Sequence, residues 1–322
     1  MSKHSVEELK LIIDLRKPIL LNKVGFEDRS ITSAIAHPDF RWNKVLTLAS
    51  TERSEKAHAN LKHLEDALEL KGEALNVIGE LNETDPLDVE VSISRALDTL
   101  EDNWRDGELW IDFTALRREE LLILVRLLVE RYEAEILCKI FGIYVSAAKM
   151  GEWLSGDIVD IRSVVGYPGE ISPARSTTLI ALMGFEINRA RAMIEAYEPS
   201  RVFLGTPALE NSISKDLFER NQEVVKRVSE DYTEIVRKEF NFSANDPSRA
   251  VADLSAILSE CGDDNIVIAP LHTKISTLAA GVVALRNPKI QICYAAVDEY
   301  NEAAYSQPSG EIYLLPFLFL KV

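Results

Sequence analysis

Two polar loops in this sequence carry side chains that suit an anionic ligand. One follows the apolar run 109–113 and contains Thr114 and Arg117. The other follows the apolar run 266–270 and contains His272, Thr273, Lys274 and Ser276. A cation in the first turn of a helix opposes the helix dipole, at a cost of about 0.3–1 kcal/mol. Charge-assisted hydrogen bonds to a bound anion, worth about 1.5–3 kcal/mol each, would offset this cost, and so would a salt bridge to a neighbouring carboxylate.

Polar or aromatic side chains also follow most of the other strand-like runs. Ligands of open parallel sheets bind at the carboxyl ends of the strands, so these side chains are further candidates. Each has a structural alternative, namely carboxylate–arginine pairing, helix capping or plain aromatic packing. The predicted ligand-binding residues are Glu27, Arg29, Thr51, Asp112, Thr114, Arg117, Glu186, Arg189, Thr206, His272, Thr273, Lys274, Ser276 and Tyr300.

The sequence repeats its order of strand-like and helix-like segments. The tripeptide Gly-Phe-Glu stands after an apolar run at 25–27 and again at 184–186, and similar segments follow in the same order each time. Short apolar runs that alternate with helical patterns are typical of parallel strands joined by crossover helices. We therefore predict an α/β fold of two tandem Rossmann-like units. They should have mainly parallel sheets, helices on both faces and a pseudo-two-fold relation.

Glycines and prolines punctuate residues 164–173, which favours a boundary there. We place the first unit, with an N-terminal helix, at 1–168 and the second unit at 169–322. The expected strands are about 18–24, 44–49, 75–80, 109–113 and 141–146 in the first unit, and about 177–183, 201–205, 234–240, 266–270 and 290–296 in the second.

Composition narrows the function. The chain has 322 residues and a formal net charge of −16, which argues against bulk binding of duplex nucleic acid but allows a small anion held by a few local cations. Its apolar runs are too short for a membrane span, so we expect a cytoplasmic protein without a membrane partner. The sequence shows no Walker A loop, and no G-x-G-x-x-G follows its first strand. We expect no cofactor and no metal site.

The second loop resembles the fourth-strand motif of the CRISPR-associated Rossmann-fold (CARF) sensor domains. That motif is a strand, a polar turn containing Thr-Lys and a helix of small residues, here 277–281. The fusion of two such units resembles the SAVED domains of bacterial anti-phage signalling. The resemblance implies a Rossmann-like pseudo-dimer that binds a cyclic oligonucleotide across the seam between its units. The matching residues are His272, Thr273, Lys274 and Ser276 in the second copy and Asp112, Thr114 and Arg117 in the first.

Three functions fit these observations. The leading hypothesis is a sensor of prokaryotic anti-phage defence that binds a nucleotide-type anion at the seam and signals to a protein partner, either an effector subunit or another copy. The second is an enzyme acting on a nucleotide or cyclic oligonucleotide, with His272 as acid or base and Lys274 or Arg117 stabilising phosphate charge. The third is a scaffold subunit, which the divergence of the two loops favours. We expect the second copy to carry more of the chemistry.

Overall fold

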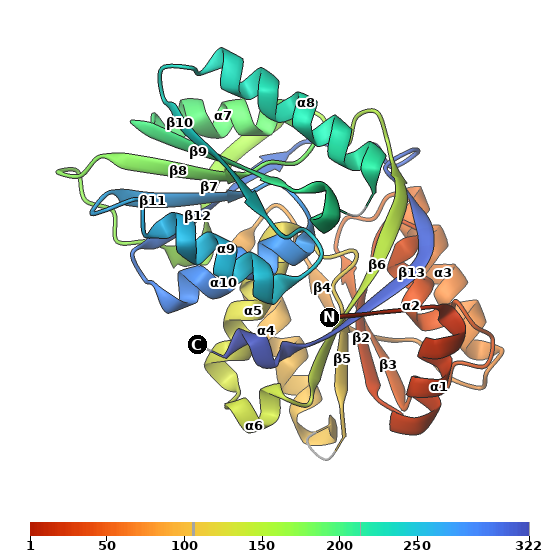
Figure 1. Ribbon diagram of the computed structural model, residues 1–322. Coiled ribbons are helices and arrows are strands. Elements are labelled where there is room, and N and C mark those ends of the chain that lie inside the picture. The colour runs from red at the N-terminus through yellow and green to blue at the C-terminus, as the bar shows by residue number, and fades with distance from the viewer. Residues whose placement is uncertain (105–106, 213, 322) are drawn as a thin grey trace. The chain divides into compact units, whose positions relative to one another are not determined.

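The chain folds into alternating strands and helices that form two mainly parallel β-sheets (Figure 1). The computed structural model describes residues 1–104, 107–212 and 214–321. In this part of the chain, one sheet has seven strands in the order β1-β13-β6-β5-β2-β3-β4. The other has six strands in the order β10-β9-β8-β11-β12-β7. The predicted α/β class with two Rossmann-like units is therefore confirmed.

The first compact unit, unit 1, contains the seven-stranded sheet and consists of Met1–Glu120, Leu127–Leu154 and Asn301–Lys321. Its strands are β1 (Ser2–His4), β2 (Ile19–Val24), β3 (Lys44–Ser50), β4 (Asn76–Leu81), β5 (Leu109–Asp112), β6 (Ile140–Met150) and β13 (Ser306–Pro316). Its helices are α1 (Val6–Arg16), α2 (Arg29–Ile35), α3 (Glu55–Glu69), α4 (Pro86–Trp104), α5 (Arg118–Arg131, of which Leu121–Arg126 belong to the second unit), α6 (Ala134–Leu137) and the 3₁₀ turn η2 (Phe317–Leu320).

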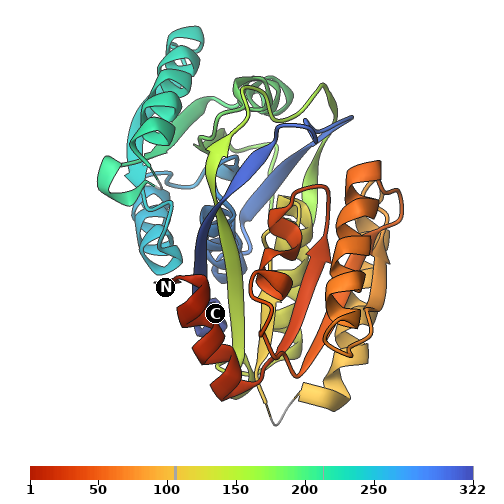
Figure 2. The ribbon, with the colours of Figure 1, turned by 90° about the vertical axis from the view of Figure 1, so that its right-hand side faces the viewer.

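Helices cover both faces of the unit 1 sheet. Figure 2 shows α1, α2 and α3 in front of one face, and α4, α5 and α6 lie on the other (Figure 1). Every residue of β2 is buried, as expected for a central parallel strand between two helical layers. Leu9 and Ile13 of α1 and Leu64 and Leu68 of α3 pack into one apolar cluster with the sheet. These helices therefore have the i, i+4 spacing that an amphipathic helix needs to bury one face.

The second compact unit, unit 2, contains the six-stranded sheet and consists mainly of Ser155–Tyr300. Apolar residues of α7 and α8 pack on one face of its sheet. Its strands are β7 (Ile158–Pro168), β8 (Thr177–Leu182), β9 (Arg201–Pro207), β10 (Val236–Phe242), β11 (Asn265–Pro270) and β12 (Ile290–Val297). Its helices are α7 (Ile187–Tyr197), α8 (Lys215–Asp231), α9 (Pro247–Leu258), α10 (Lys274–Arg286) and the 3₁₀ turn η1 (Leu209–Asn211).

The parallel strands have the same order in both units. Numbered within its own unit, each sheet runs third, second, first, fourth, fifth: β4-β3-β2-β5-β6 and β10-β9-β8-β11-β12. The direction of the strand order therefore reverses between β2 and β5 in unit 1 and between β8 and β11 in unit 2. Such a topological switch point opens a crevice beyond the carboxyl ends of the strands and is the usual ligand position in open α/β sheets.

The two sheets exchange their last strands. β7 follows the five parallel strands of unit 1 in sequence, but it pairs antiparallel with β12 in the sheet of unit 2. β13 follows the parallel strands of unit 2 and pairs antiparallel with β6 in the sheet of unit 1. Both units are therefore discontinuous in sequence. The predicted boundary between the two copies, after residue 168, stays a prediction. β7 lies before this boundary in the sequence, whereas β12, with which it pairs, lies after it.

All ten predicted strands form, and each begins within two residues of its predicted position. β6 extends further than expected, to Met150, because it pairs along its length with β13. The three-residue strand β1 was not predicted, since its pairing with β13 is set by a contact more than 300 residues away in sequence. Among the residues that the structure describes, every helix is too short or too polar to cross a lipid bilayer.

Candidate anion-binding site at the strand ends of unit 1

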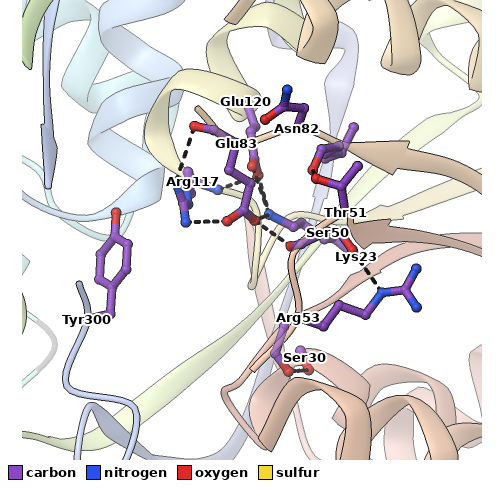
Figure 3. Close-up of polar contacts among 12 residues, drawn as sticks. Lys23, Ser30, Ser50, Thr51, Arg53, Asn82, Glu83, Arg117, Glu120 and Tyr300 are labelled. Carbon is purple, nitrogen blue, oxygen red and sulfur yellow. Dashed lines mark hydrogen bonds and ion pairs between the residues drawn. The ribbon is translucent and has the colours of Figure 1, made fainter. Parts of the chain in front are cut away.

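Charged and hydroxyl side chains from four neighbouring strand ends meet at the switch point of unit 1. Lys23 lies near the end of β2, and Ser50 is the last residue of β3. Glu83 stands in the loop after β4, and the turn after β5 leads to Arg117, the N-cap residue of α5, and to Glu120 in its first turn. Figure 3 shows Lys23, Ser50 and Arg117 directed toward the carboxylate of Glu83. We call these five residues the strand-end network.

Lys23 is the most deeply buried cation of the network. Its side chain is 2% exposed, and its ammonium group donates hydrogen bonds to both carboxylate oxygens of Glu120, at 2.7 and 2.9 Å, and to Glu83. Burial alone would lower the pKa of the Lys23 ammonium group, but the charges of Glu120 and Glu83 outweigh it and raise this pKa above its usual value. The two carboxylates therefore favour the charged form of Lys23 inside the protein.

The Glu83 carboxylate forms hydrogen bonds or ion pairs with three other members of the network. Ser50 donates its hydroxyl hydrogen to Glu83 Oε1 at 2.5 Å, Lys23 donates to the same oxygen, and the Arg117 guanidinium forms an ion pair with Oε2. Burial alone would raise the pKa of this carboxyl group. The charges of Lys23 and Arg117 and the hydrogen bonds of Lys23 and Ser50 outweigh it, so the pKa of Glu83 lies below its usual value.

Glu120 connects the start of α5 to the centre of the sheet. Its Oε2 accepts the backbone N–H of Arg117 at 2.8 Å, which satisfies a hydrogen-bond donor that the helix itself leaves open. The same carboxylate holds Lys23. The strand-end network thus directs an ammonium, a guanidinium and a hydroxyl group toward one point, where Glu83 supplies the oxygens. The same donors suit the oxygens of a phosphate group.

Of the residues predicted for unit 1, Arg117 belongs to this network, and Asp112 and Thr114 support the loop that carries it. Asp112 is buried and accepts the backbone N–H of Thr114 at 2.7 Å. The Thr114 hydroxyl accepts the backbone N–H of Val145 at 2.9 Å, which joins the end of β5 to β6. Thr51 is exposed, and its N–H and hydroxyl both donate to the carbonyl oxygen of Leu81 in β4.

Glu27 and Arg29 form a buried pair elsewhere in unit 1. The Arg29 guanidinium donates to Glu27 Oε2 at 2.5 and 3.1 Å, to the Val145 carbonyl oxygen at 2.7 Å and to the Ser306 hydroxyl at 3.0 Å. The pair thereby ties the turn before α2 to β6 and β13. This arrangement matches the structural alternative of carboxylate–arginine pairing, and a ligand contact by either residue stays a prediction.

Three residues predicted for unit 2 lie together near the ends of β8 and β12. Arg189 is 3% exposed; its Nε lies 3.4 Å from Glu186, and its guanidinium carbon lies 5.9 Å from the centre of the Tyr300 ring. Glu186 also accepts a hydrogen bond from Ser155. The structure thus brings Glu186, Arg189 and Tyr300 into one cluster. Whether this cluster binds a ligand stays a prediction.

Three more residues predicted for unit 2, Thr206, Thr273 and Ser276, form hydrogen bonds within that unit. Thr273 is the N-cap of α10: its hydroxyl accepts the Ser276 N–H at 3.2 Å and donates to the Ala244 carbonyl oxygen at 3.0 Å. Ser276 donates to the Thr273 carbonyl oxygen at 2.8 Å. The Thr206 hydroxyl donates to the buried amide of Asn221 at 2.7 Å. The bond between Thr273 and the Ser276 N–H matches the capping alternative, whereas Thr206 bonds a side chain inside α8.

His272 and Lys274 flank this cap and are both partly buried. The His272 ring lies edge-on to Phe242, with 5.4 Å between ring centres, and 6.2 Å from the ring of Phe185. An aromatic environment of this kind positions the imidazole beside the end of β10. The proposed acid or base role of His272 and the phosphate role of Lys274 stay predictions.

The sequence reasoning missed Lys23, Glu83 and Glu120. A signal was present, because Lys23 stands in a strand-like run that begins with three apolar residues, and a lysine buried in a central strand needs carboxylate partners. In unit 2 the residue two positions before the repeated glycine is Leu182, which is also buried. At this position of the repeat, unit 1 therefore has a charged residue and unit 2 an apolar one. The greater share of chemistry expected for the second copy stays a prediction.

A shallow pocket of about 240 Å³ lies elsewhere, between α8 and β10 of unit 2. Its lining includes Gln222, Lys226 and Glu239 and none of the predicted site residues. Lys226 already pairs with a carboxylate of its own helix. This pocket lies away from the topological switch point of unit 2, which is between β8 and β11.

Comparison with known proteins adds a fold likeness. No protein-family model and no curated protein matches the sequence. Among solved structures, the chain is similar to a type III CRISPR defence DNA nuclease activated by cyclic oligoadenylate, with a TM-score of 0.51, 10% sequence identity and coverage of 85% of this chain. This chain spans 65% of the length of that nuclease. Leucoanthocyanidin reductase with NADPH from Vitis vinifera matches with a TM-score of 0.25, 11% identity and coverage of 84% and 88% of the two chains. The first likeness concerns the fold alone, and the second is too distant to carry an argument.

Proposed function

We propose that this chain is a ligand-sensing protein that binds a nucleotide-type anion at the carboxyl ends of the unit 1 strands. The observation that carries the proposal is the convergence of Lys23, Arg117 and Ser50 on one carboxylate at the topological switch point. Such a position is where open α/β sheets hold phosphate-bearing ligands. A sensor of this kind passes its signal to an effector subunit or to another copy of the chain.

Local electrostatics support an anionic ligand despite the overall charge of −16. Charge–charge interactions of exposed groups are screened within about 8–10 Å at physiological salt, so distant carboxylates oppose binding weakly. Charge-assisted hydrogen bonds to a desolvated phosphate are worth about 1.5–3 kcal/mol each. Two cations and one hydroxyl group, once they no longer bind the Glu83 carboxylate, are therefore enough to select a phosphate over a neutral ligand.

The fold likeness suggests which nucleotides to try first. The nuclease to which this chain is similar is activated by cyclic oligoadenylate. The CARF-type resemblance of the sequence suggests the same ligand class and a role in prokaryotic defence. Cyclic oligoadenylates of several ring sizes are thus the first candidates. The position of the ligand relative to the two copies stays a prediction.

Calorimetry with inorganic phosphate, AMP and cyclic oligoadenylates tests this proposal. We expect at least one cyclic oligoadenylate to bind. We also expect Arg117→Ala to weaken binding about 10- to 100-fold, the equivalent of one lost charge-assisted bond. Arg41→Ala is the matched control, since Arg41 is an exposed arginine of unit 1 outside the network. Chromatography of the same mixtures shows whether the ligand is turned over, as the enzyme hypothesis requires. Unchanged binding by Arg117→Ala, or no binding of any compound, contradicts the proposal.

A further inference from the structure

We infer that Glu83 is an internal anion that occupies the phosphate position of the site and that a bound ligand displaces it. This inference rests on the proposed function and adds how the site is regulated. Glu83 receives donors from the ends of three strand segments: Lys23 of β2, Ser50 of β3 and Arg117 after β5. One carboxylate thus takes the donors that would otherwise hold two oxygens of a phosphate.

The exposure of the network shows which member must move. The side chains of Lys23 and Glu120 are each 2% exposed, whereas those of Glu83 and Arg117 are 17% and 28% exposed. Glu83 therefore lies on the solvent side of Lys23 and covers it. An anion that arrives from solvent meets Arg117 first and reaches Lys23 only after the Glu83 side chain has turned away.

Charge balance leads to the same conclusion. Lys23, Arg117, Glu83 and Glu120 carry two positive and two negative charges, so the closed network is neutral. A phosphate added beside Glu83 would place like charges next to each other at low dielectric, which is strongly unfavourable. When Glu83 turns away, the remaining network has a charge of +1 and attracts the phosphate.

The loop that carries Glu83 links this displacement to a helix. Glu83 lies between β4 and α4, and Asp85 accepts the backbone N–H groups of Leu87 and Asp88 in the first turn of α4, at 3.0 and 3.4 Å. Only Thr84 therefore separates Glu83 from Asp85, whose carboxylate caps a 19-residue helix. We expect the outward turn of Glu83 to shift the loop backbone that leads into α4, which would give the sensor a structural output.

The variant Glu83→Gln separates this inference from a purely structural salt bridge. Glutamine keeps the size of the side chain and an oxygen that can accept from Lys23, but it removes the competing charge. We expect Glu83→Gln to bind inorganic phosphate and the cyclic oligoadenylate at least about tenfold more tightly than the wild type. If Glu83 only supported the fold, the variant would bind equally or more weakly. Glu80→Gln is the control, because Glu80 lies in β4, just before the loop of Glu83, and pairs with Arg53 outside the network.

The outcomes distinguish this inference from the proposed function. Tighter phosphate binding by Glu83→Gln supports displacement, even if the wild type binds no nucleotide and the proposed function fails. Nucleotide binding by the wild type without a gain in Glu83→Gln overturns displacement and leaves the proposed function intact. No phosphate binding by either protein overturns displacement.

Hydrogen exchange of the wild type provides a test that needs no variant. Saturating inorganic phosphate should speed the exchange of the backbone N–H groups of residues 84–88 other than Pro86, which has none, because their cap is disturbed when Glu83 leaves its partners. The amides of α3, outside the network, are the internal reference. Unchanged or slower exchange at residues 84–88 would overturn displacement whether or not Glu83→Gln folds.

Discussion

Replacing Lys23 by methionine tests whether the strand-end network is as buried as the structure shows. Methionine retains most of the apolar stem of lysine and removes only the ammonium group. The carboxylate of Glu120, whose side chain is 2% exposed, would then lose the ammonium group that lies 2.7 Å from it in the wild type. Glu83 would lose its hydrogen bond to the same ammonium group.

The expected cost follows from this burial. Removing one partner of a buried ion pair destabilises a protein by about 3–5 kcal/mol, because the remaining charge is left without compensation. Domains are typically stable by about 5–15 kcal/mol, so Lys23→Met should remove a large part of the unfolding free energy. Adding Glu120→Gln should recover some of the loss, since glutamine removes the uncompensated charge while its oxygen still accepts the Arg117 N–H.

Urea unfolding followed by circular dichroism and tryptophan fluorescence measures these differences by linear extrapolation. Lys62→Met is the control, because Lys62 forms exposed pairs with Glu65 and Asp66 on α3. This control should leave the urea midpoint unchanged. A cost below about 1 kcal/mol for Lys23→Met would refute the reasoning, because that is the value of an exposed pair. So would a double variant in which the two costs simply add.

Two further predictions concern pH and backbone packing. Because the pKa of Glu83 is lowered by folding, its contribution to stability is full above its unfolded-state pKa and is lost as pH falls through its folded-state pKa. Urea unfolding should therefore show the stability gap between wild type and Glu83→Gln closing below about pH 4; a gap that widens in acid contradicts the assignment. Gly184→Ala should cost about 1–3 kcal/mol in thermal or urea unfolding, since its Cβ would lie 2.0 Å from the Leu271 carbonyl oxygen. Gly25→Ala, with its nearest neighbour at 3.6 Å, should be tolerated, and equal costs for the two would contradict this difference.

The order of the elements could be predicted from the sequence because it depends on local patterns. Apolar runs such as 109–113 and 266–270 are short, lie between helical patterns and recur in the same order in both halves. Each becomes a parallel strand flanked by helices. Capping residues such as Thr273 also act locally, since a hydroxyl group and the N–H three residues later meet in any helix that starts there. Fold class and strand positions therefore needed only neighbouring residues.

The contacts of the candidate site depended on the tertiary structure. Glu83 lies 60 positions after Lys23 in the sequence, and Glu120 lies 97 positions after it. No local pattern relates these three residues. They meet because strand order places β2 between β3 and β5, and because a buried ammonium group requires carboxylates within hydrogen-bonding distance. Arg117 was predicted from its own loop, but its carboxylate partner Glu83 comes from a different strand end.

The exchange of β7 and β13 between the two sheets is a feature of the fold that the sequence pattern did not predict. Their sequences mark two more apolar segments at equivalent places of the repeat. An open sheet edge offers the same backbone donors and acceptors to either segment, so local composition does not choose between the two sheets. The sequence by itself determined which segments become the ten parallel strands. Only the tertiary structure decided which strands share a sheet and which buried charges face each other, because both depend on contacts between residues far apart in the chain.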